Sequence, residues 1–334
     1  MTDQTTPRPR GKAAFSVSQE GIVFALTLIL FATFSLMLDN FLSVGNVVAL
    51  LRSVSVLGML ALGMALVVIG RGIDLAMVAS LVVGLAWALT LNRGGMELGL
   101  ALTLGALFTL AAGLIIGLIV AFAEIPAVFT TLAMGSVIFG FGNAFFFNID
   151  VHNAPGNVDW LRALGYASVL GVPLAIYAFA ALALIVHLVL RYTRYGRLLY
   201  AMGDNPETAR MTGIAVRPMI VSQYVISGFI GFLAGLVIVA SNSGINTRLF
   251  TSTLVYDVLL VVVLGGIGLA GGRGGVRNVL VGTLLVGTLL SGMTILNLSF
   301  TAQNLIKSLV LLAALIADTF INPRDEQTSQ QGDI

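Results

Sequence analysis

One acidic residue of this sequence stands inside a long apolar stretch, where a carboxylate is rare. Asp257 lies within the apolar run 254–264. A charged side chain that faces lipid is costly, so an ionisable residue inside a membrane segment indicates a functional site by default. We therefore expect Asp257 to face a solute route or a subunit contact. Asn242, Asn246 and Arg248 lie just before this run and are polar enough to line an entrance, although an ordinary solvated loop is the commoner arrangement.

A second acid, Asp74, belongs to the segment Gly-Arg-Gly-Ile-Asp-Leu at 70–75, directly after the apolar run 61–69. It is a candidate for the same solute route. The alternative is an interfacial residue that caps a helix beginning at Leu75, with Arg71 as its charge partner. Capping needs only one acceptor near free N–H groups, so this alternative is at least as well founded.

The other polar residues of the sequence do not form an enzyme centre, because they offer no nucleophile–base pair, metal cluster or chain of membrane acids. The absence of cysteine excludes disulfides and thiolate sites. His152 and His187 stand alone, which favours structural or surface roles. The glycine-rich segment 264–275 lacks the βαβ context of a phosphate loop, so it predicts a glycine-broken membrane helix. Its beginning, VVLGGIGLA at 262–270, echoes VVIGRGIDLA at 67–76 and suggests a shared local geometry.

The composition indicates the kind of element that must position these residues. The chain has 334 residues, 58% of them hydrophobic and 10% charged, and its mean hydropathy is +1.01. Soluble domains have about 45–50% apolar and about 25% charged residues, so this is an all-α polytopic membrane protein. A span needs about 20 apolar residues to cross about 30 Å of hydrocarbon. We predict ten transmembrane helices, near residues 21–38, 47–69, 75–91, 98–122, 125–147, 171–190, 219–240, 251–264, 278–296 and 302–320.

The longest polar interruption is the basic segment 191–218. Within it, Asn205, Pro206 and Glu207 fit an N-cap, a first helical position and an acidic first turn, and Gly213 fits the residue after a helix end. The segment therefore predicts a short, stiff helix in a loop. The chain divides into a tail (1–20), a transmembrane domain (21–320) that contains this loop, and a second tail (321–334).

The distribution of lysine and arginine sets the orientation. With the N-terminus inside, the loop 191–218 and most other basic residues fall on the cytoplasmic side, as the positive-inside rule requires. Both termini are then cytoplasmic, and the longest outer loop is about 148–170, with Trp160 as an interfacial anchor. Membrane orientation explains the net charge of +2 and the pI near 9.1, so lipid and not nucleic acid is the expected environment.

Four motifs together resemble the permease subunits of ribose-type (simple sugar) ABC importers, from about Asn46 to Asp318. Gly-Ile-Asp-Leu at 72–75, the glycine stretch 262–275, and Pro126-Ala127 with Thr131-Leu132-Ala133-Met134 each resemble one motif of that family. The fourth is the family's cytoplasmic loop pattern, carried here by Gly203, Asn205, Ala209, Arg210, Gly213 and Ile214. The motifs occur in the family's order.

The resemblance implies the ABC importer permease fold, in a multi-pass protein of the bacterial plasma (inner) membrane. It implies a second permease subunit, in a homo- or heterodimer, two cytoplasmic ABC ATPase subunits that use ATP, and an extracytoplasmic solute-binding protein. This chain would itself bind no cofactor and catalyse no reaction. The loop would contain the coupling helix, with contacts to the ATPase from Gly203, Asn205, Glu207, Ala209, Arg210 and Gly213. The candidates for the substrate pathway are Asp74, Asn242 and Asp257.

The expected function is ATP-driven import of a simple sugar, a pentose, a hexose or a related polar metabolite. Ala76-Met77-Val78-Ala79, Val255 and Phe139 depart from the family pattern and leave the solute open, so a branched-chain amino acid or a nucleoside is an alternative. An ion-coupled secondary carrier is a further alternative, which the scarcity of membrane acids disfavours. A purely structural membrane protein would need neither an acid within a span nor glycine-broken helix ends.

The topology can be tested by introducing single cysteines into this cysteine-free chain. A cysteine at Gly203 should be protected from a membrane-impermeant thiol probe in intact cells, and a cysteine at Asp159 should react, because the positive-inside rule places them on opposite sides. Labelling of the loop 191–218 from outside would contradict the predicted orientation.

Overall fold

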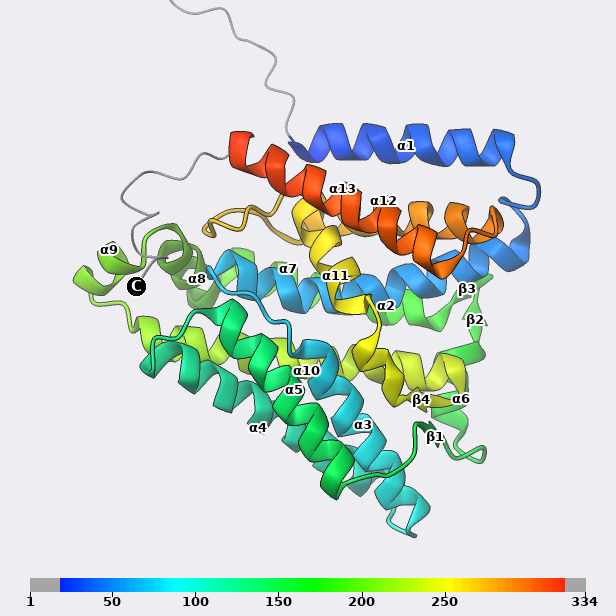
Figure 1. Ribbon diagram of the computed structural model, residues 1–334, viewed down its shortest axis with the longest axis horizontal. Helices are drawn as coiled ribbons and strands as arrows, with labels where there is room; N and C mark the ends of the chain where they lie inside the picture. Colours follow the sequence, from blue (N-terminus) through cyan, green and yellow to red (C-terminus); the bar gives the residue numbers. More distant parts are fainter. Residues whose placement is uncertain (1–18, 322–334) are drawn as a thin grey trace, which may run out of the picture.

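The computed structural model describes residues 19–321, so the predicted tails lie almost wholly outside the described part of the chain. Residues 19–321 are all-α apart from four short strands, and each of the ten predicted spans coincides with one apolar helix (Figure 1). These helices are α1 (Gln19–Met37), α2 (Val44–Ile69), α3 (Met77–Arg93), α4 (Leu98–Phe122), α5 (Ala127–Phe145), α7 (Leu174–Tyr192), α10 (Val216–Asn242), α11 (Leu254–Leu264), α12 (Val276–Ile295) and α13 (Phe300–Ile321).

Seven of the described helices are long and apolar enough to cross a membrane, and α3, α11 and the apolar part of α13 (Phe300–Ile316) are shorter. With 11 residues, α11 is about 16 Å long, roughly half the thickness of the hydrocarbon layer. The predicted crossing at 251–264 is corrected accordingly, because this helix cannot span the layer by itself.

The centre of the molecule is formed by α2 and α10, which run through its middle in Figure 1, whereas α1 lies along one edge. In the most apolar stretch of each helix, 83% of the residues are buried in α2 and 67% in α10, against 11% in α1. The peripheral helices α1, α5 and α13 expose large apolar side chains such as Ile29, Phe129 and Leu309. An outer surface of this kind is suited to lipid and not to water.

Small residues bring α4 close to its neighbours, as the recurrence of glycine at 99–117 predicts. A Cβ on Gly105 would overlap the carbonyl oxygen of Gly84 in α3, and one on Gly113 would lie 2.6 Å from the carbonyl oxygen of Tyr224 in α10. Any side chain at these two positions would push the helices apart.

The end of α2 is a sharp, fully bonded helix stop. The N–H of Arg71 donates to the carbonyl oxygen of Val68 (2.9 Å), and that of Gly72 to the carbonyl oxygen of Val67 (2.8 Å). These bonds form a Schellman motif, whose residue after the cap is left-handed. Arg71 takes this position with φ +69°, a conformation that costs an L-residue about 1–2 kcal/mol.

The end of α11 repeats this geometry. The N–H of Gly266 donates to the carbonyl oxygen of Val263 (3.0 Å), and that of Ile267 to the carbonyl oxygen of Val262 (3.1 Å). Gly266 has φ +89° and takes the place of Arg71. The predicted shared geometry of the two segments is therefore confirmed at the level of single hydrogen bonds.

The loops that are predicted to lie outside contain structure that was not predicted from the sequence. The strand β1 (Val151–Asn153) pairs antiparallel with β4 (Gly244–Asn246), and β2 (Ser168–Val169) with β3 (Val172–Pro173). The amphipathic helix α6 (Asp159–Tyr166) lies between β1 and β2 in the chain, and Trp160 on it is 51% exposed, as an interfacial anchor requires.

Asn246 and Arg248, two candidates for an entrance, hold this outer structure together instead. The side chain of Asn246 accepts a hydrogen bond from the N–H of Arg248 (2.9 Å) and caps the 3₁₀ helix η1 (Thr247–Thr251). Arg248 forms an ion pair with Asp150 (2.8 Å). The cap is local, and the ion pair joins the chain segments next to β1 and β4, so both contacts are structural.

His152 also has a structural role, as predicted. It is 5% exposed, and its Nδ1 lies 3.1 Å from Oγ1 of Thr90 and its Nε2 3.0 Å from the carbonyl oxygen of Ile149. Burial lowers its pKa, because removal from water disfavours the charged imidazolium.

Candidate functional site

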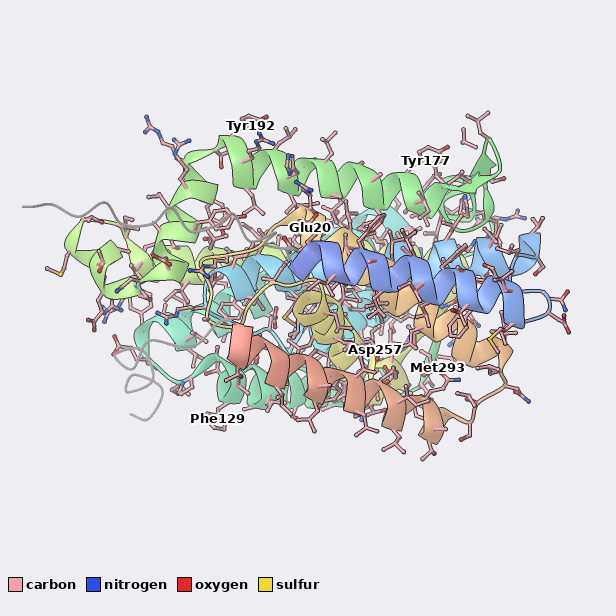
Figure 2. All side chains as sticks on the ribbon, turned by 90° about the horizontal axis from the view of Figure 1, so that it is seen from above. Glu20, Phe129, Tyr177, Tyr192, Asp257 and Met293 are labelled. Atoms are coloured by element: carbon pink, nitrogen blue, oxygen red, sulfur yellow. The ribbon has the colours of Figure 1, made fainter. Side chains whose placement is uncertain are left out.

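A buried ion pair joins α11 to α13. Nζ of Lys307 lies 2.8 Å from Oδ1 and 3.0 Å from Oδ2 of Asp257, and it donates to Oγ1 of Thr253 (2.8 Å). The side chains of Lys307 and Asp257 are 10% and 13% exposed. The opposite charge and the hydrogen bonds allow this carboxylate to lie in an apolar interior. Asp257 therefore faces α13 and not lipid (Figure 2).

Lys307 was not predicted from the sequence as a site residue. It lies within the predicted span 302–320, where a lysine is as unusual as the acid at 257. Two opposite charges, each inside its own apolar run, were a signal that these runs pack side by side with the charges in contact.

A cavity of about 450 Å³, here called the central cavity, lies between α2, α10 and α11. Its polar lining residues are Arg52, Ser53, Ser241, Asn242 and Asp257. Nε of Arg52 and Oγ of Ser241 are two of the four buried side-chain atoms that have no hydrogen-bond partner among the described residues. Buried polar atoms require partners, so this cavity suits a molecule that carries hydroxyl or carbonyl groups. Two of the predicted pathway residues, Asn242 and Asp257, are thus brought together.

Asp257 also lines a second cavity, of about 370 Å³, between α11 and α13. This side cavity contains Thr253, Tyr256, Asn304 and Lys307 as further polar lining residues. The ion pair therefore stands in the wall between the two cavities.

Asp74 lies elsewhere and does not line the central cavity. It is 2% exposed, its Oδ2 accepts a hydrogen bond from Oγ of Ser227 in α10 (2.7 Å), and its Oδ1 accepts one from the N–H of Ala76 (3.2 Å). The helix α3 begins at Met77 and not at Leu75. Asp74 accepts the N–H of the residue before α3, as a capping residue would, but it is buried and not interfacial, and its bond to Ser227 holds the break before α3 against α10.

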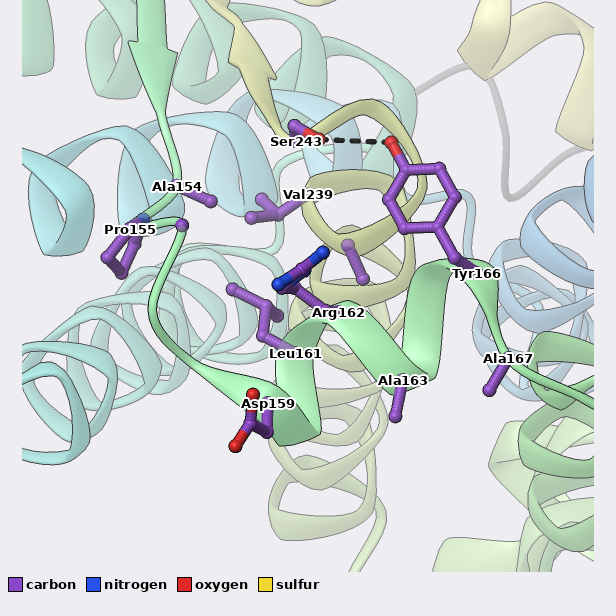
Figure 3. Close-up of a pocket in the computed structure, with 12 residues that line it drawn as sticks. Ala154, Pro155, Asp159, Leu161, Arg162, Ala163, Tyr166, Ala167, Val239 and Ser243 are labelled. Carbon is purple, nitrogen blue, oxygen red and sulfur yellow. Dashed lines mark hydrogen bonds between the residues drawn. The ribbon is translucent and has the colours of Figure 1, made fainter.

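An outer pocket of about 660 Å³ lies between α6 and the end of α10 (Figure 3). Oη of Tyr166 and Oγ of Ser243, both in its lining, are 3.0 Å apart. The guanidinium carbon of Arg52 lies 5.6 Å from the centre of the Tyr166 ring, within range of a cation–π interaction. Arg52, which was not among the predicted site residues, thus connects the outer pocket to the central cavity.

The predicted loop helix is present as α9 (Pro206–Met211), one residue after α8 (Arg194–Asp204). Oδ1 of Asn205 accepts hydrogen bonds from the N–H groups of Glu207 and Thr208, both at 3.0 Å. Gly213 has φ +84°, and its N–H donates to the carbonyl oxygen of Arg210 (3.0 Å). The predicted N-cap and C-terminal stop are confirmed.

Two residues of the predicted coupling set do not lie as expected. Gly203 is buried inside α8, and Ala209 is 4% exposed because it packs against the chain's own interior, so neither offers a surface to the ATPase. The side chains that α9 presents outward are those of Glu207, Thr208, Arg210 and Met211. Met211 is 88% exposed, so it replaces the buried Gly203 as the position for the topology label.

The stability of the protein should depend jointly on the two charges of this ion pair. Lys307→Met leaves a buried carboxylate without its partner and should lower stability by about 3–5 kcal/mol. The double variant Asp257→Asn/Lys307→Met removes both charges and should recover most of this loss. Thermal unfolding of the purified protein in detergent measures both. A double variant less stable than Lys307→Met alone would show that the two charges do not depend on each other.

Comparison with known proteins identifies the family to which the chain is similar. Residues 46–317 match the family described as "Branched-chain amino acid transport system / permease component". The ribose import permease protein RbsC of Escherichia coli strain K12 is 32% identical over 322 residues, which cover 95% of this chain and 99% of that protein. The L-arabinose transport system permease protein AraH of the same strain is 32% identical over 304 residues, covering 90% and 89%. The L-arabinose ABC transporter permease protein AraH of Azospirillum brasilense is 30% identical over 313 residues, covering 94% and 91%.

No solved structure matches the chain. The family match extends over the nine apolar helices after α1, the central cavity and the loop with α9, and the relatives match almost from end to end. The chain therefore belongs to the family of branched-chain amino acid transport system permease components, within which the similar proteins described above are sugar permeases.

Proposed function

We propose that this chain is the permease subunit of an ATP-driven importer for a simple sugar of the pentose type. The observation that carries the proposal is the nearly end-to-end similarity to ribose and arabinose permeases. The family description names branched-chain amino acids, so these remain the second candidate solutes. The importer would include cytoplasmic ATPase subunits, an extracytoplasmic solute-binding protein and a second permease subunit.

The central cavity is the proposed passage for the solute. Its free polar atoms, on Arg52 and Ser241, can each engage an uncharged hydroxyl group. Lys307 neutralises Asp257, so this carboxylate does not demand a cationic solute. A cavity with few polar groups and no unbalanced acid suits weak, transient binding of a neutral polyol, as passage requires.

Uptake measurements test the proposed function. The chain, co-expressed with the ATPase and the binding protein encoded beside it, should confer energy-dependent uptake of radiolabelled ribose or arabinose on cells that lack their own pentose transporters. Radiolabelled leucine and uridine serve as probes of the two alternative solute classes. Uptake of leucine or uridine with neither sugar would overturn the proposal of a sugar importer.

The exposed face of α9 is the proposed docking site for the ATPase. Met211 projects an adaptable apolar side chain away from the body of the protein, and Arg210 beside it provides a planar fork for a carboxylate or carbonyl. Capping at both ends keeps this six-residue helix from fraying under load. Ala209 contributes by fixing the helix to the chain's own interior and not by contact with the partner.

Met211→Glu tests the docking site. A charge at the centre of an apolar contact should reduce co-purification of the ATPase by about tenfold or more, while membrane insertion is retained. Leu170→Glu is the matched control, because Leu170 is 94% exposed on the opposite, outer side. Equal co-purification with both variants would exclude α9 as the docking site.

A further inference from the structure

The segment before α9 is in direct backbone contact with the end of α2. A Cβ on Gly203 in α8 would overlap the carbonyl oxygen of Ile69, the last residue of α2, and would lie 2.7 Å from the backbone nitrogen of Gly272. The same carbonyl oxygen accepts a hydrogen bond from the N–H of Gly272 (2.8 Å). Three chain segments thus meet at one backbone group with no side chain between them.

The loop after α11 completes this contact. Gly271 and Gly272 have φ of +80° and +70°, which glycine adopts without strain. A Cβ on Gly271 would lie 2.8 Å from the carbonyl oxygen of Gly203, and one on Gly272 would lie 2.8 Å from the backbone nitrogen of Asp204. We name the contact of Gly203, Asp204, Ile69 and Gly271–Gly272 the glycine junction.

A side-chain hydrogen bond reinforces the glycine junction. Oη of Tyr200, one turn before Gly203 in α8, donates to the carbonyl oxygen of Gly274 (2.7 Å). Leu199 and Met202 in the same helix are 0% and 1% exposed, so α8 is embedded in the body of the protein and is not a mobile loop. Such close packing resists gradual deformation.

The glycine junction connects the docking helix to the walls of the central cavity. Only Asn205 separates α8 from α9, so the two short helices have almost no slack between them. On the other side, α2 leads from Ile69 back to Arg52, and α11 leads from the loop back to Asp257. Both of these residues line the central cavity.

We infer that the glycine junction fuses α8 to the cytoplasmic ends of α2 and α11, so that displacement of α9 moves the two cavity-lining helices as one body. The inference rests on the proposed function, in which the ATPase docks on α9 and displaces it. Gly203, Gly271 and Gly272 are positioning residues in this arrangement. They do not contact the solute. Because they have no side chains, the three segments approach closely enough that they cannot slide past one another.

A variant that loosens the glycine junction should uncouple ATP hydrolysis from sugar uptake. Gly203→Ala forces α8 away from Ile69 and should reduce sugar uptake by about tenfold, while the ATPase still co-purifies and still hydrolyses ATP. Gly140→Ala in α5 is the matched control, because nothing lies within 4 Å of a Cβ there. Normal uptake by Gly203→Ala would overturn the inference. Loss of the ATPase from the complex would also do so, since it would show that Gly203 acts through docking.

A disulfide across the glycine junction provides a second test of the inference, which still applies if Gly203→Ala does not fold. A Cβ on Gly272 would lie 3.0 Å from Cβ of Asp204, slightly closer than the 3.5–4.5 Å of a disulfide, so Asp204→Cys/Gly272→Cys should form one on oxidation. Since a side chain at Gly272 loosens the glycine junction, uptake by the reduced variant should be lowered, and the disulfide, which joins the two segments again, should raise uptake and leave ATP hydrolysis unchanged. Arrest on oxidation, reversed by dithiothreitol, would show that the segments part during the cycle.

The same samples separate this inference from the proposed function. If the unmodified transporter takes up neither ribose nor arabinose, the sugar assignment fails, and the rate of ATP hydrolysis before and after oxidation still tests the glycine junction. An unchanged rate supports fusion of the three segments, and a reversible fall in the rate contradicts it.

Discussion

The constraint on which this fold depends is that a backbone polar group inside a membrane must find its partner within the protein. The chain breaks two membrane helices, α2 and α11, and each break would expose the last carbonyl groups of its helix. At both breaks, the two hydrogen bonds of a Schellman motif satisfy some of these carbonyl groups. The carbonyl oxygen of Ile69, at the end of α2, accepts a further hydrogen bond from the N–H of Gly272, in the loop after α11. The need to satisfy the backbone therefore brings the two breaks together and requires glycine where they meet.

The second constraint is electrostatic. A lysine and an aspartate from different helices neutralise each other in the wall between two cavities, and this pairing fixes α13 against α11. Arg52 lacks an acidic partner of this kind among the described ion pairs, and its guanidinium lies against Tyr166 at the outer pocket. Asp257, Lys307 and Arg52 thus lie at the cavities, while the outward faces of α1, α5 and α13 are apolar.

The sequence predicted what depends on neighbours in the chain. The ten apolar helices, the Asn205 cap, the Gly213 stop and the shared geometry of the two breaks all follow from local composition and spacing. It did not predict which face of α9 is buried, because a six-residue helix carries no periodic signal, and so Ala209 was assigned to the wrong surface. Contacts between distant segments, such as Lys307 with Asp257 or Gly203 with Ile69, depend on the packing of helices that no local pattern specifies.

The placement of Ala209 and Gly203 changes how the loop should be understood. As residues of a docking surface, they would be free to vary with the partner. As buried contacts, they attach α8 and α9 to the membrane helices, and only the outward side chains of α9 are left for another protein. A short helix transmits force only if it is held at its base, because otherwise it swings on its own linker. In the proposed coupling, the buried side of the loop would therefore be as necessary as the exposed side, and Gly203, Gly271 and Gly272 would be points of rigid attachment.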